Sequence, residues 1–319
     1  MNNIVLFLSA AFIWGSTWLM ITFQLGSVEP LVSVIYRFGL ASFVLFVYSY
    51  FTRKRFNYSV YEHLLIFLQG LFMFGFNYWL TYLAITKINS SMAAILSTSI
   101  VYFNVIFASV FLGDKIKREV VIGASIGVVG IILVFLPQET ASDQLASVFS
   151  SSFWSSLSIT NPFNQFDSSS SAQMGITLLL LGSIFASLGN IISAKTQRLK
   201  IPVIQANALG MAYAVILLMF IAVLTDVKFG FEVTFEYIGS LVYLSIFGTV
   251  IAFGAFLTLL GKIGPDKAGY ISLIYPIIAL GFSTVYEDYQ WSIVGGVGVL
   301  IILLGNFVAM GKYRFMRKK

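Results

Sequence analysis

Cysteine is absent from this chain of 319 residues, and histidine occurs only once. No disulfide bond can form, so cysteine usage says nothing about the redox compartment. Zinc and haem sites need several thiolate or imidazole ligands, which this chain cannot supply. We therefore expect no metal site and no other cofactor.

Charged residues are also scarce, at 10% of the chain against about 25% in soluble domains. Hydrophobic residues make up 58%, and the mean hydropathy is +0.91, which excludes an ordinary soluble protein. A membrane-spanning helix needs about 20 mostly apolar residues. Ten stretches are predicted to be such helices: Ile4–Gln24, Pro30–Phe51, Leu64–Ile85, Ser91–Leu112, Val120–Leu136, Gly175–Ala194, Pro202–Thr225, Tyr237–Leu260, Ala268–Tyr286 and Ser292–Met310. The first has no Lys or Arg before it and is too long for a signal peptide, so we expect it to be retained.

The net charge of +6 does not indicate a nucleic-acid partner, because the cations follow the predicted topology. With a cytoplasmic N-terminus, sixteen of the 19 Lys and Arg residues fall on the cytoplasmic side. Lys87 and Lys228 fall outside, and Arg37 lies within a segment. This asymmetry is the positive-inside bias. We therefore expect a multi-pass protein of the cell membrane, a bacterial inner membrane, with both termini cytoplasmic and a basic tail that meets anionic lipid headgroups.

The two halves of the chain repeat at a nearly constant offset. Pro30 and Pro202, which each open a segment, are 172 residues apart, and Asp114 and Glu287 are 173 apart. Each half holds five segments, an odd number, so the second half enters the membrane from the opposite face. The result is an inverted-topology repeat, an arrangement that many secondary transporters use.

Short motifs in both halves strengthen this interpretation. They are Trp14-Gly15-Ser16-Thr17-Trp18, Arg37-Phe38, Leu112-Gly113-Asp114, Tyr275-Pro276, Glu287 and Trp291. With them the chain resembles the EamA branch of the drug/metabolite transporter superfamily, over nearly its whole length except residues 138–173. The resemblance implies an all-α integral membrane protein with ten transmembrane helices in two inverted five-helix repeats. It also implies transport of amino acids, nucleosides, sugars or other small metabolites, often outward. Ser187-Leu188-Gly189-Asn190 stands where the family often has tryptophan.

The chain is expected to divide into four parts. Residues 1–137 form the first EamA-like repeat, 138–173 an external loop, 174–311 the second repeat, and 312–319 a basic cytoplasmic tail. The loop has twelve serines between Ser142 and Ser171 and no Lys or Arg, which suits an exported segment. It is either a poorly ordered connector whose apolar residues dip against the bilayer or a cap over the outer gate.

Arg37 is the one full charge well inside a predicted span. Seven residues after Pro30, it lies roughly 10 Å along the helix, at 1.5 Å per residue. A charge at this depth is costly, so it faces a watery cavity, pairs, or extends its head group toward the interface. In the first case the cavity favours a solute with a carboxylate or phosphate. The matching position near Leu209 has no charge, so such a site would be asymmetric.

No Asp or Glu lies in the middle of a predicted span, although proton-driven pumps usually keep a carboxylate there. This argues against direct proton coupling. Asp114 and Glu287 lie at segment ends on opposite faces of the membrane. We interpret them as partners of nearby N–H or cationic groups, and a latch between alternating states is the other hypothesis.

Uncharged polar and aromatic side chains recur at helical spacing in several segments. Family pockets are built mainly from the first, third, fourth, sixth, eighth and ninth helices, so the resemblance implies that such residues line the site. The same stripes also occur as ordinary packing between membrane helices. With Arg37, the candidate substrate-binding residues are Trp14, Thr17, Trp18, Asn77, Tyr78, Thr81, Tyr82, Thr98, Tyr102, Asn190, Tyr270 and Tyr275.

Glycines gather in the fifth and tenth segments, where they favour close helix contact within the bundle or between the protomers of a homodimer. They are Gly123, Gly127, Gly130, Gly295, Gly296 and Gly298. Pro276 lies inside the ninth segment and frees a backbone carbonyl. It indicates either plain curvature or a broken helix at a binding site.

The sequence therefore predicts alternating-access transport of a small organic solute, an amino acid or related metabolite, with export as the direction. Its expected partners are that solute and the lipid bilayer. An enzyme is not expected. An intramembrane enzyme for lipid or polyprenyl substrates needs a carboxylate, histidine or metal constellation near an interface, and no such spacing occurs. A membrane sensor would carry a soluble output domain, and a channel rarely needs an inverted repeat.

Overall fold

The computed structural model describes residues 2–54, 56–113, 118–134, 170–263, 271–287 and 293–309, and all regular structure in these ranges is helical. This confirms the predicted all-α class. Seven of the described helices are long and apolar enough to cross a membrane: Asn3–Thr22, Pro30–Phe51, Val60–Ile85, Ser90–Phe111, Ser171–Arg198, Val203–Leu224 and Phe235–Phe256. Shorter apolar helices occupy Val121–Gly130, Ile274–Tyr286 and Ile293–Val308. The predicted count of ten spans therefore stays a prediction.

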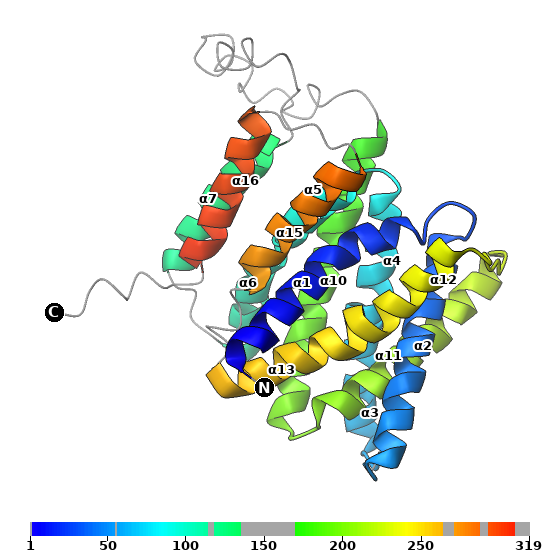
Figure 1. Cartoon of the computed structure of the whole chain (residues 1–319). Coiled ribbons are helices and arrows are strands. Elements are labelled where there is room, and N and C mark those ends of the chain that lie inside the picture. The colour runs from blue at the N-terminus through cyan, green and yellow to red at the C-terminus, as the bar shows by residue number, and fades with distance from the viewer. Residues whose placement is uncertain are drawn as a thin grey trace.

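The elements follow one another as in Figure 1. The first half holds α1 (Asn3–Thr22), α2 (Pro30–Phe51), α3 (Val60–Gly70), η1 (Leu71–Phe76), α4 (Asn77–Ile85), α5 (Ser90–Ser97), α6 (Ile100–Leu112) and α7 (Arg118–Val134). The second half holds α10 (Ser170–Arg198), α11 (Val203–Leu224), α12 (Phe235–Val242), η2 (Tyr243–Ile251), α13 (Ala252–Ile263), α15 (Ile271–Tyr286) and α16 (Ile293–Ala309). The η elements are π-helical turns, and each continues directly into the α-helices on both sides.

Helix ends follow from local chemistry. Pro30 stands in the first turn of α2, where its missing N–H would have had no helical partner. At the start of α3, the Glu62 carboxylate accepts from the Ser59 N–H at 2.7 Å, and Ser59 Oγ accepts from the Glu62 N–H at 3.3 Å. Gly113 ends α6 with a φ of +75°, a left-handed conformation that glycine adopts without steric cost.

Helices from the two halves interleave. α1 packs against α13 and α15, α10 packs against α4 and α6, and α2 packs against α11. α7 and α16 pack mainly on each other and form a pair beside the other helices in Figure 1. The largest buried apolar cluster takes residues from α1, α2, η1, α4, α5, α10, α11 and η2, among them Phe38, Phe74, Leu179 and Leu218.

Glycines permit the closest crossings. A Cβ on Gly130 would lie 2.7 Å from the carbonyl oxygen of Gly298, and a Cβ on Gly305 would lie 2.6 Å from that of Gly123. The glycines predicted to favour close contact therefore bring α7 and α16 together within one chain. A homodimer remains a prediction.

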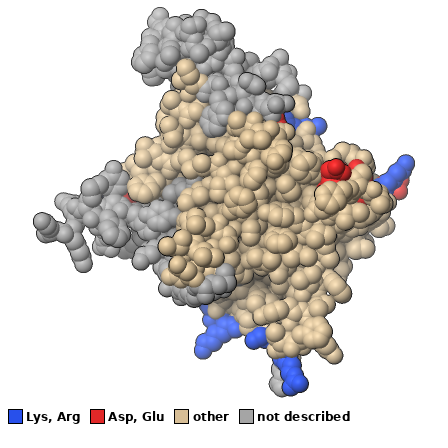
Figure 2. Space-filling model, in the orientation of Figure 1, with Lys and Arg blue, Asp and Glu red and all other residues tan. Residues whose placement is uncertain are grey.

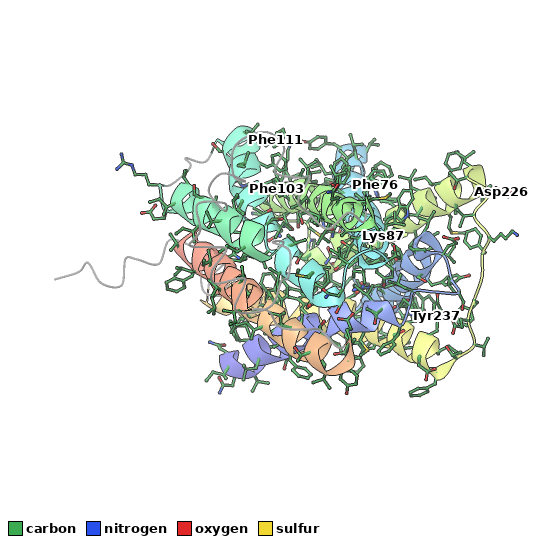
Figure 3. The ribbon with its side chains drawn as sticks, turned by 90° about the horizontal axis from the view of Figure 1, so that it is seen from above. Phe76, Lys87, Phe103, Phe111, Asp226 and Tyr237 are labelled. Atoms are coloured by element: carbon green, nitrogen blue, oxygen red, sulfur yellow. The ribbon has the colours of Figure 1, made fainter. Side chains whose placement is uncertain are left out.

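On the face that Figure 2 shows, exposed charge lies at the ends of the bundle. Lys and Arg side chains project at the end where α2 leads into α3 and α10 leads into α11, while a broad uncharged band covers the middle of the visible face. Seen from above, Asp226 and Tyr237 lie toward one side of the molecule and Phe103 and Phe111 toward the other (Figure 3). Phe111 is 61% exposed, as expected for a residue that meets lipid acyl chains.

Three predictions can be compared in detail with the observed helices. α10 begins at Ser170, five residues before the predicted start and inside the predicted external loop, because its polar first turn continues the helix beyond the apolar run. α15 runs through Pro276 as one helix. Most of the loop, together with Asp114, Tyr270 and Trp291, lies outside the described residues.

Candidate substrate-binding cavity

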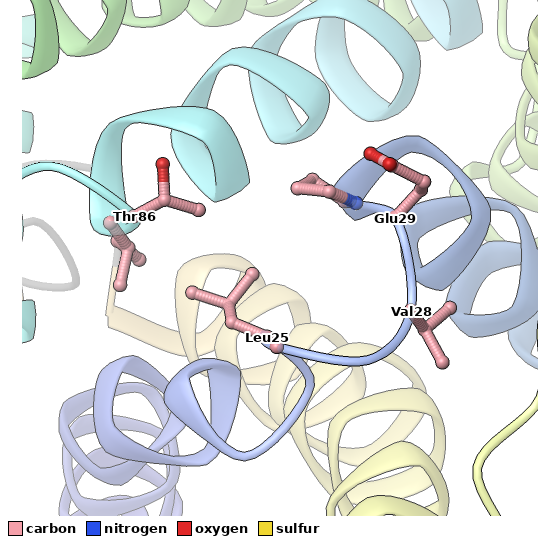
Figure 4. Close-up of a pocket in the computed structure, with 7 residues that line it drawn as sticks. Leu25, Val28, Glu29 and Thr86 are labelled. Atoms are coloured by element: carbon pink, nitrogen blue, oxygen red, sulfur yellow. The ribbon is translucent and has the colours of Figure 1, made fainter. Parts of the chain in front are cut away.

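Two hollows in the described part of the chain are of a size to hold a small solute. The larger, about 430 Å³, opens between the α1–α2 loop and the end of α4 (Figure 4). It is lined by Leu25, Gly26, Val28, Glu29, Pro30, Ile85 and Thr86. Its polar groups are few and Thr86 Oγ1 is already donating to the Leu83 carbonyl at 2.7 Å, so little in it converges on a ligand.

The second hollow, the central cavity, has a volume of about 230 Å³ and lies between helices of both halves. α1, η1, α4, α5, α6, α10, α13 and α15 contribute its walls, and these belong to the first, third, fourth, sixth, eighth and ninth segments predicted from the sequence. The lining residues are Trp14, Thr17, Trp18, Ile21, Met73, Asn77, Tyr78, Thr81, Ser97, Ile100, Leu179, Ser183, Ala186, Asn190, Phe253 and Tyr275.

Aromatic side chains shape two of the walls. The rings of Trp18 and Tyr275 stack with centroids 6.4 Å apart and planes at 17°. The Trp14 ring meets Phe253 edge-on at 5.3 Å, while its indole N–H donates to the Gly248 carbonyl at 3.2 Å. Trp14 is thereby tied to η2, and the broad faces of Trp18 and Tyr275 give a solute apolar area at small cost in side-chain entropy.

Most hydroxyl protons in the lining are already used in hydrogen bonds within the protein. Thr17 donates to the Trp14 carbonyl at 2.7 Å, and Ser183 donates to the Leu179 carbonyl at 3.0 Å. Ser97 and Tyr275 share a hydrogen bond at 3.0 Å. These oxygens therefore face the cavity chiefly as acceptors.

Three lining donors remain available. Among the described residues no hydrogen-bond partner is found for the Trp18 indole N–H or for the hydroxyls of Tyr78 and Thr81. The Asn77 amide donates to the Met73 carbonyl at 3.2 Å, and the Asn190 amide donates to Asn104 Oδ1 at 3.2 Å. This orientation of each amide leaves its own oxygen free to accept from a solute. The lining thus offers donors and acceptors together but no charged side chain.

Arg37 lies behind the cavity wall rather than on it. Its side chain is 1% exposed, and its guanidinium lies 4.7 Å from the centroid of the Tyr78 ring, which does line the cavity. One guanidinium N–H donates to the Tyr82 hydroxyl at 3.3 Å. Arg37 is therefore neither extended to the interface nor in the lining. Of the three alternatives left open by the sequence it follows pairing, with the neutral Tyr82 hydroxyl and the Tyr78 ring as its partners.

The other predicted candidates divide between the cavity and the packing around it. Eight of them line the cavity: Trp14, Thr17, Trp18, Asn77, Tyr78, Thr81, Asn190 and Tyr275. Tyr82 is fully buried beside Arg37, Thr98 is buried against its own helix, and Tyr102 points to α7 with its hydroxyl 3.4 Å from the Gly123 carbonyl. The role of all of them in binding stays a proposal.

Some lining residues were not predicted. Ser97 and Ser183 are polar, and Met73, Ile100, Leu179 and Phe253 are apolar. Ser97 directly precedes Thr98, which was predicted, and it is three residues before Ile100, another lining residue. Residues three apart share one face of a helix, so this spacing could have identified Ser97 from the sequence. Apolar lining residues carry no sequence signal that separates them from packing residues.

Glu287, which follows the last turn of α15, meets the first turn of α5. Its carboxylate accepts from the Ser90 hydroxyl at 2.6 Å and from the Ser90 N–H at 3.3 Å. A carboxylate at a helix N-terminus is stabilised by the unpaired N–H groups there. This contact agrees with the interpretation of Glu287 as a partner of a nearby N–H, and it joins the two halves of the chain.

The central cavity has an uncharged lining. Its lining contains no Asp, Glu, His, Lys or Arg that could serve as acid or base. Among the described residues no group of three or more His, Cys, Asp or Glu side chains could hold a metal ion.

Comparisons with known proteins agree with this architecture. The chain is 22% identical over 314 residues to an uncharacterized transporter, YoaV, of Bacillus subtilis, covering 98% of this chain and 97% of that protein. It is 24% identical over 313 residues to an uncharacterized inner membrane transporter, YedA, of Escherichia coli, covering 96% and 90%. A crystal structure shares its fold at a TM-score of 0.65 and 16% identity, covering 99% of both chains.

The family assignment rests on most of the sequence. A model of the EamA-like transporter family matches residues 1–136 and 173–311, which contain every lining residue of the central cavity. Membrane helices, a solute-sized cavity between them and relatives named as transporters all point the same way. The chain belongs to the EamA-like transporter family.

Proposed function

We propose that the protein is a secondary transporter that moves a small organic solute, an amino acid or related metabolite, by alternating access. The central cavity between the halves carries this proposal. Its volume of about 230 Å³ equals that of roughly eight liquid waters at ~30 Å³ each, which suits a small metabolite. Mixed donors and acceptors beside stacked aromatic rings suit a solute with both polar and apolar parts. The resemblance to exporting members of the family favours the outward direction.

The contacts between helices occur in matching pairs in the two halves, which supports two inverted five-helix repeats with ten spans in all. In this mapping α1 corresponds to α10, α4 to α13, and α6 to α15. The α1–α15 contact then corresponds to α10–α6, and the α1–α13 contact corresponds to α10–α4. Both members of each exchange occur. The α2–α11 and α7–α16 pairs map onto themselves, as pairs on a pseudo-twofold axis do.

The π-helical turns repeat with the same period. η1 contains Phe74-Gly75 and η2 contains Phe247-Gly248, and the two dipeptides are 173 residues apart. A π-turn is rare in α-helices and occurs mostly at functional sites. Two of them at equivalent places, with Met73 of η1 in the cavity lining, support a common ancestry of the halves and a shared role beside the site.

The absence of cysteine permits a direct test, because one introduced thiol is then the only thiol in the chain. Ser183→Cys in the cavity wall should react with a membrane-impermeant maleimide from either face of the membrane, and a transported solute should slow both reactions. Ser27→Cys and Asn57→Cys, in exposed loops at opposite ends of α2, should react only from outside and only from inside. Reaction of Ser183→Cys from one face alone would contradict alternating access. Labelling of the two loop variants from the same face would contradict the proposed topology.

Glu287 should act as a latch on the outer side. A hydrogen bond to a charged group contributes about 1.5–3 kcal/mol, and about 1.4 kcal/mol corresponds to tenfold in an equilibrium. Glu287→Ala should therefore raise the outside labelling rate of Ser183→Cys at least about tenfold. Glu232→Ala is the matched control, because the one hydrogen bond that Glu232 accepts from the described residues comes from Thr234 in its own loop. Equal rates in the two variants would mean that the Glu287–Ser90 contact is purely structural.

A further inference from the structure

We propose that Arg37 sets the charge selectivity of the central cavity, so that it accepts solutes with a negative group, a carboxylate or a phosphate, and rejects organic cations. The inference rests on the proposed function, since it names the solute class of the same cavity. It assigns Arg37 as a specificity-determining residue that acts on the solute through the wall and does not touch it.

Arg37 is a buried cation without a counter-charge. Its side chain is 1% exposed, and its Nε has no hydrogen-bond partner. Arginine keeps its positive charge in proteins. Among the described residues Arg37 forms no ion pair, and its neighbours are the neutral Tyr82 hydroxyl and the rings of Phe38 and Tyr78. A charged side chain in the membrane interior costs considerable free energy, so its presence there indicates a function.

Two routes connect this charge to the cavity. The guanidinium lies 4.7 Å from the centroid of the Tyr78 ring, and Tyr78 lines the cavity. The second route passes Gly248, which lies between Arg37 and Thr17. A Cβ added to Gly248 would lie 2.8 Å from Thr17 Cγ2 and 3.7 Å from an Arg37 Nη. Thr17 also lines the cavity. The charge is thus one side chain removed from the bound solute on both routes.

Nothing in the described surroundings cancels its field. The cavity lining carries no charge, and every described carboxylate stands at a helix end or in a loop: Glu29, Glu62, Glu119, Asp226, Glu232, Glu236 and Glu287. Low permittivity between buried groups preserves the potential of Arg37 across one layer of side chains. The cavity is therefore positive although its walls are neutral.

The second half has no equivalent charge. The offset of 172 residues between Pro30 and Pro202, which open the two matching segments, takes Arg37 to Leu209, which is uncharged. The positive potential is consequently strongest in the part of the cavity near Thr17, Tyr78 and Thr81 and extends from there across the cavity. The free hydroxyls of Tyr78 and Thr81 are placed to donate to an anionic group there, while the stacked rings of Trp18 and Tyr275 take the apolar part.

The expected discrimination follows from distance. An anion in contact with the far side of the Tyr78 ring would lie about 8 Å from the guanidinium, allowing ~3.5 Å for the contact. With an effective permittivity of about 20, the Coulomb attraction at this distance favours the anion over a neutral isostere on the order of 30-fold. A cation of the same size should bind more weakly again by a similar factor.

The test compares four small probes with the same phenyl body: phenylacetate, phenylacetamide, phenethylammonium and phenyl phosphate. Dissociation constants of the purified full-length protein should favour phenylacetate over phenylacetamide about 30-fold, with phenethylammonium weakest. Phenyl phosphate distinguishes a preference for phosphate from one for carboxylate. Arg37→Gln should bring the acid-to-amide ratio close to one, and Arg37→Lys, which keeps the charge, should retain most of it. Equal affinity of the wild-type protein for acid and amide would overturn the inference.

A second measurement needs neither a ligand nor a substituted Arg37. Ser183→Cys is treated with methanethiosulfonates of similar size and opposite charge, and the ratio of the two rates is divided by the ratio at the exposed Ser27→Cys. Because the same thiol reacts with both reagents, its own reactivity cancels, and the quotient reports the potential in the cavity. A quotient above ten in favour of the anionic reagent supports the inference, and a quotient near one overturns it.

The outcomes separate this inference from the proposed function. If all four probes bind equally and compete for one site in the cavity, the cavity binds solutes but Arg37 does not select them. If none binds, the assignment of the cavity itself fails and the inference fails with it. A purely structural Arg37 would lower the folded yield or all affinities alike on substitution, without changing the acid-to-amide ratio.

Discussion

Substitution of Ala186 by phenylalanine should abolish solute binding while the protein still folds. Ala186 lies in the cavity wall on α10 and is 7% exposed. A cavity of about 150 Å³ holds a benzene molecule, so the central cavity of about 230 Å³ can take the new ring. The ring then occupies the volume that the solute needs. We expect the dissociation constant of any transported solute to rise at least 100-fold.

Ligand-dependent thermal stabilisation measures this effect. At a solute concentration 100 times the wild-type dissociation constant, binding stabilises the folded state by about 2.7 kcal/mol. A 100-fold weaker constant reduces this to about 0.4 kcal/mol. Leu181→Phe is the matched control, because Leu181 is on the same helix but 43% exposed on the outer surface of the bundle. Equal stabilisation of both variants would mean that the solute binds elsewhere, for example in the hollow beside Glu29 and Thr86.

Replacement of Gly70 by alanine should destabilise the bundle by about 1–3 kcal/mol, the usual cost of overpacking. Gly70 ends α3 where it crosses α11, and an added Cβ would overlap the backbone of Gly210, with the Gly210 Cα only 2.6 Å away. Backbone atoms cannot move aside as a flexible side chain can. Because α3 continues directly into η1 and α4, the displacement should also reach the cavity residues Asn77 and Tyr78 and weaken solute binding.

Gly39→Ala is the control for helix propensity. Gly39 lies within α2, and nothing stands within 4 Å of the position that its Cβ would take. There the substitution should be neutral or should stabilise by about 0.5–1 kcal/mol, since alanine favours the helix. Thermal unfolding in detergent compares the two variants. A similar midpoint for both would show that α3 and α11 are not held at the Gly70–Gly210 crossing.

The helices themselves were accessible from the sequence because a lipid environment acts on each segment separately. An uncharged run of sufficient length must form a helix there, since its backbone groups find no other partner. The predicted Pro30–Phe51 segment agrees with α2 at both ends for this reason. The π-turns η1 and η2 were not predicted, because these stretches are apolar at nearly every position, so the shift of helical register caused by one inserted residue leaves no signal in the sequence.

The candidate site was predicted in part. Trp14, Thr17 and Trp18 were identified from spacing within one helix, and they line the cavity. Arg37, Thr98 and Tyr102 were chosen by the same chemistry, but their helices turn them toward other neighbours. Polarity in an apolar segment signals that a side chain needs a partner, and it does not distinguish a solute from another helix.

The sequence by itself determined the solvent, the helical class and the distribution of charge, because these depend on the cost of placing each residue in lipid or water. Only the tertiary structure decided which helix faces meet. Rotation of each helix is set by contacts such as Gly70 with Gly210, between residues far apart in the chain. Those contacts place the buried charge of Arg37 behind Tyr78, and with it the feature that we propose selects the solute.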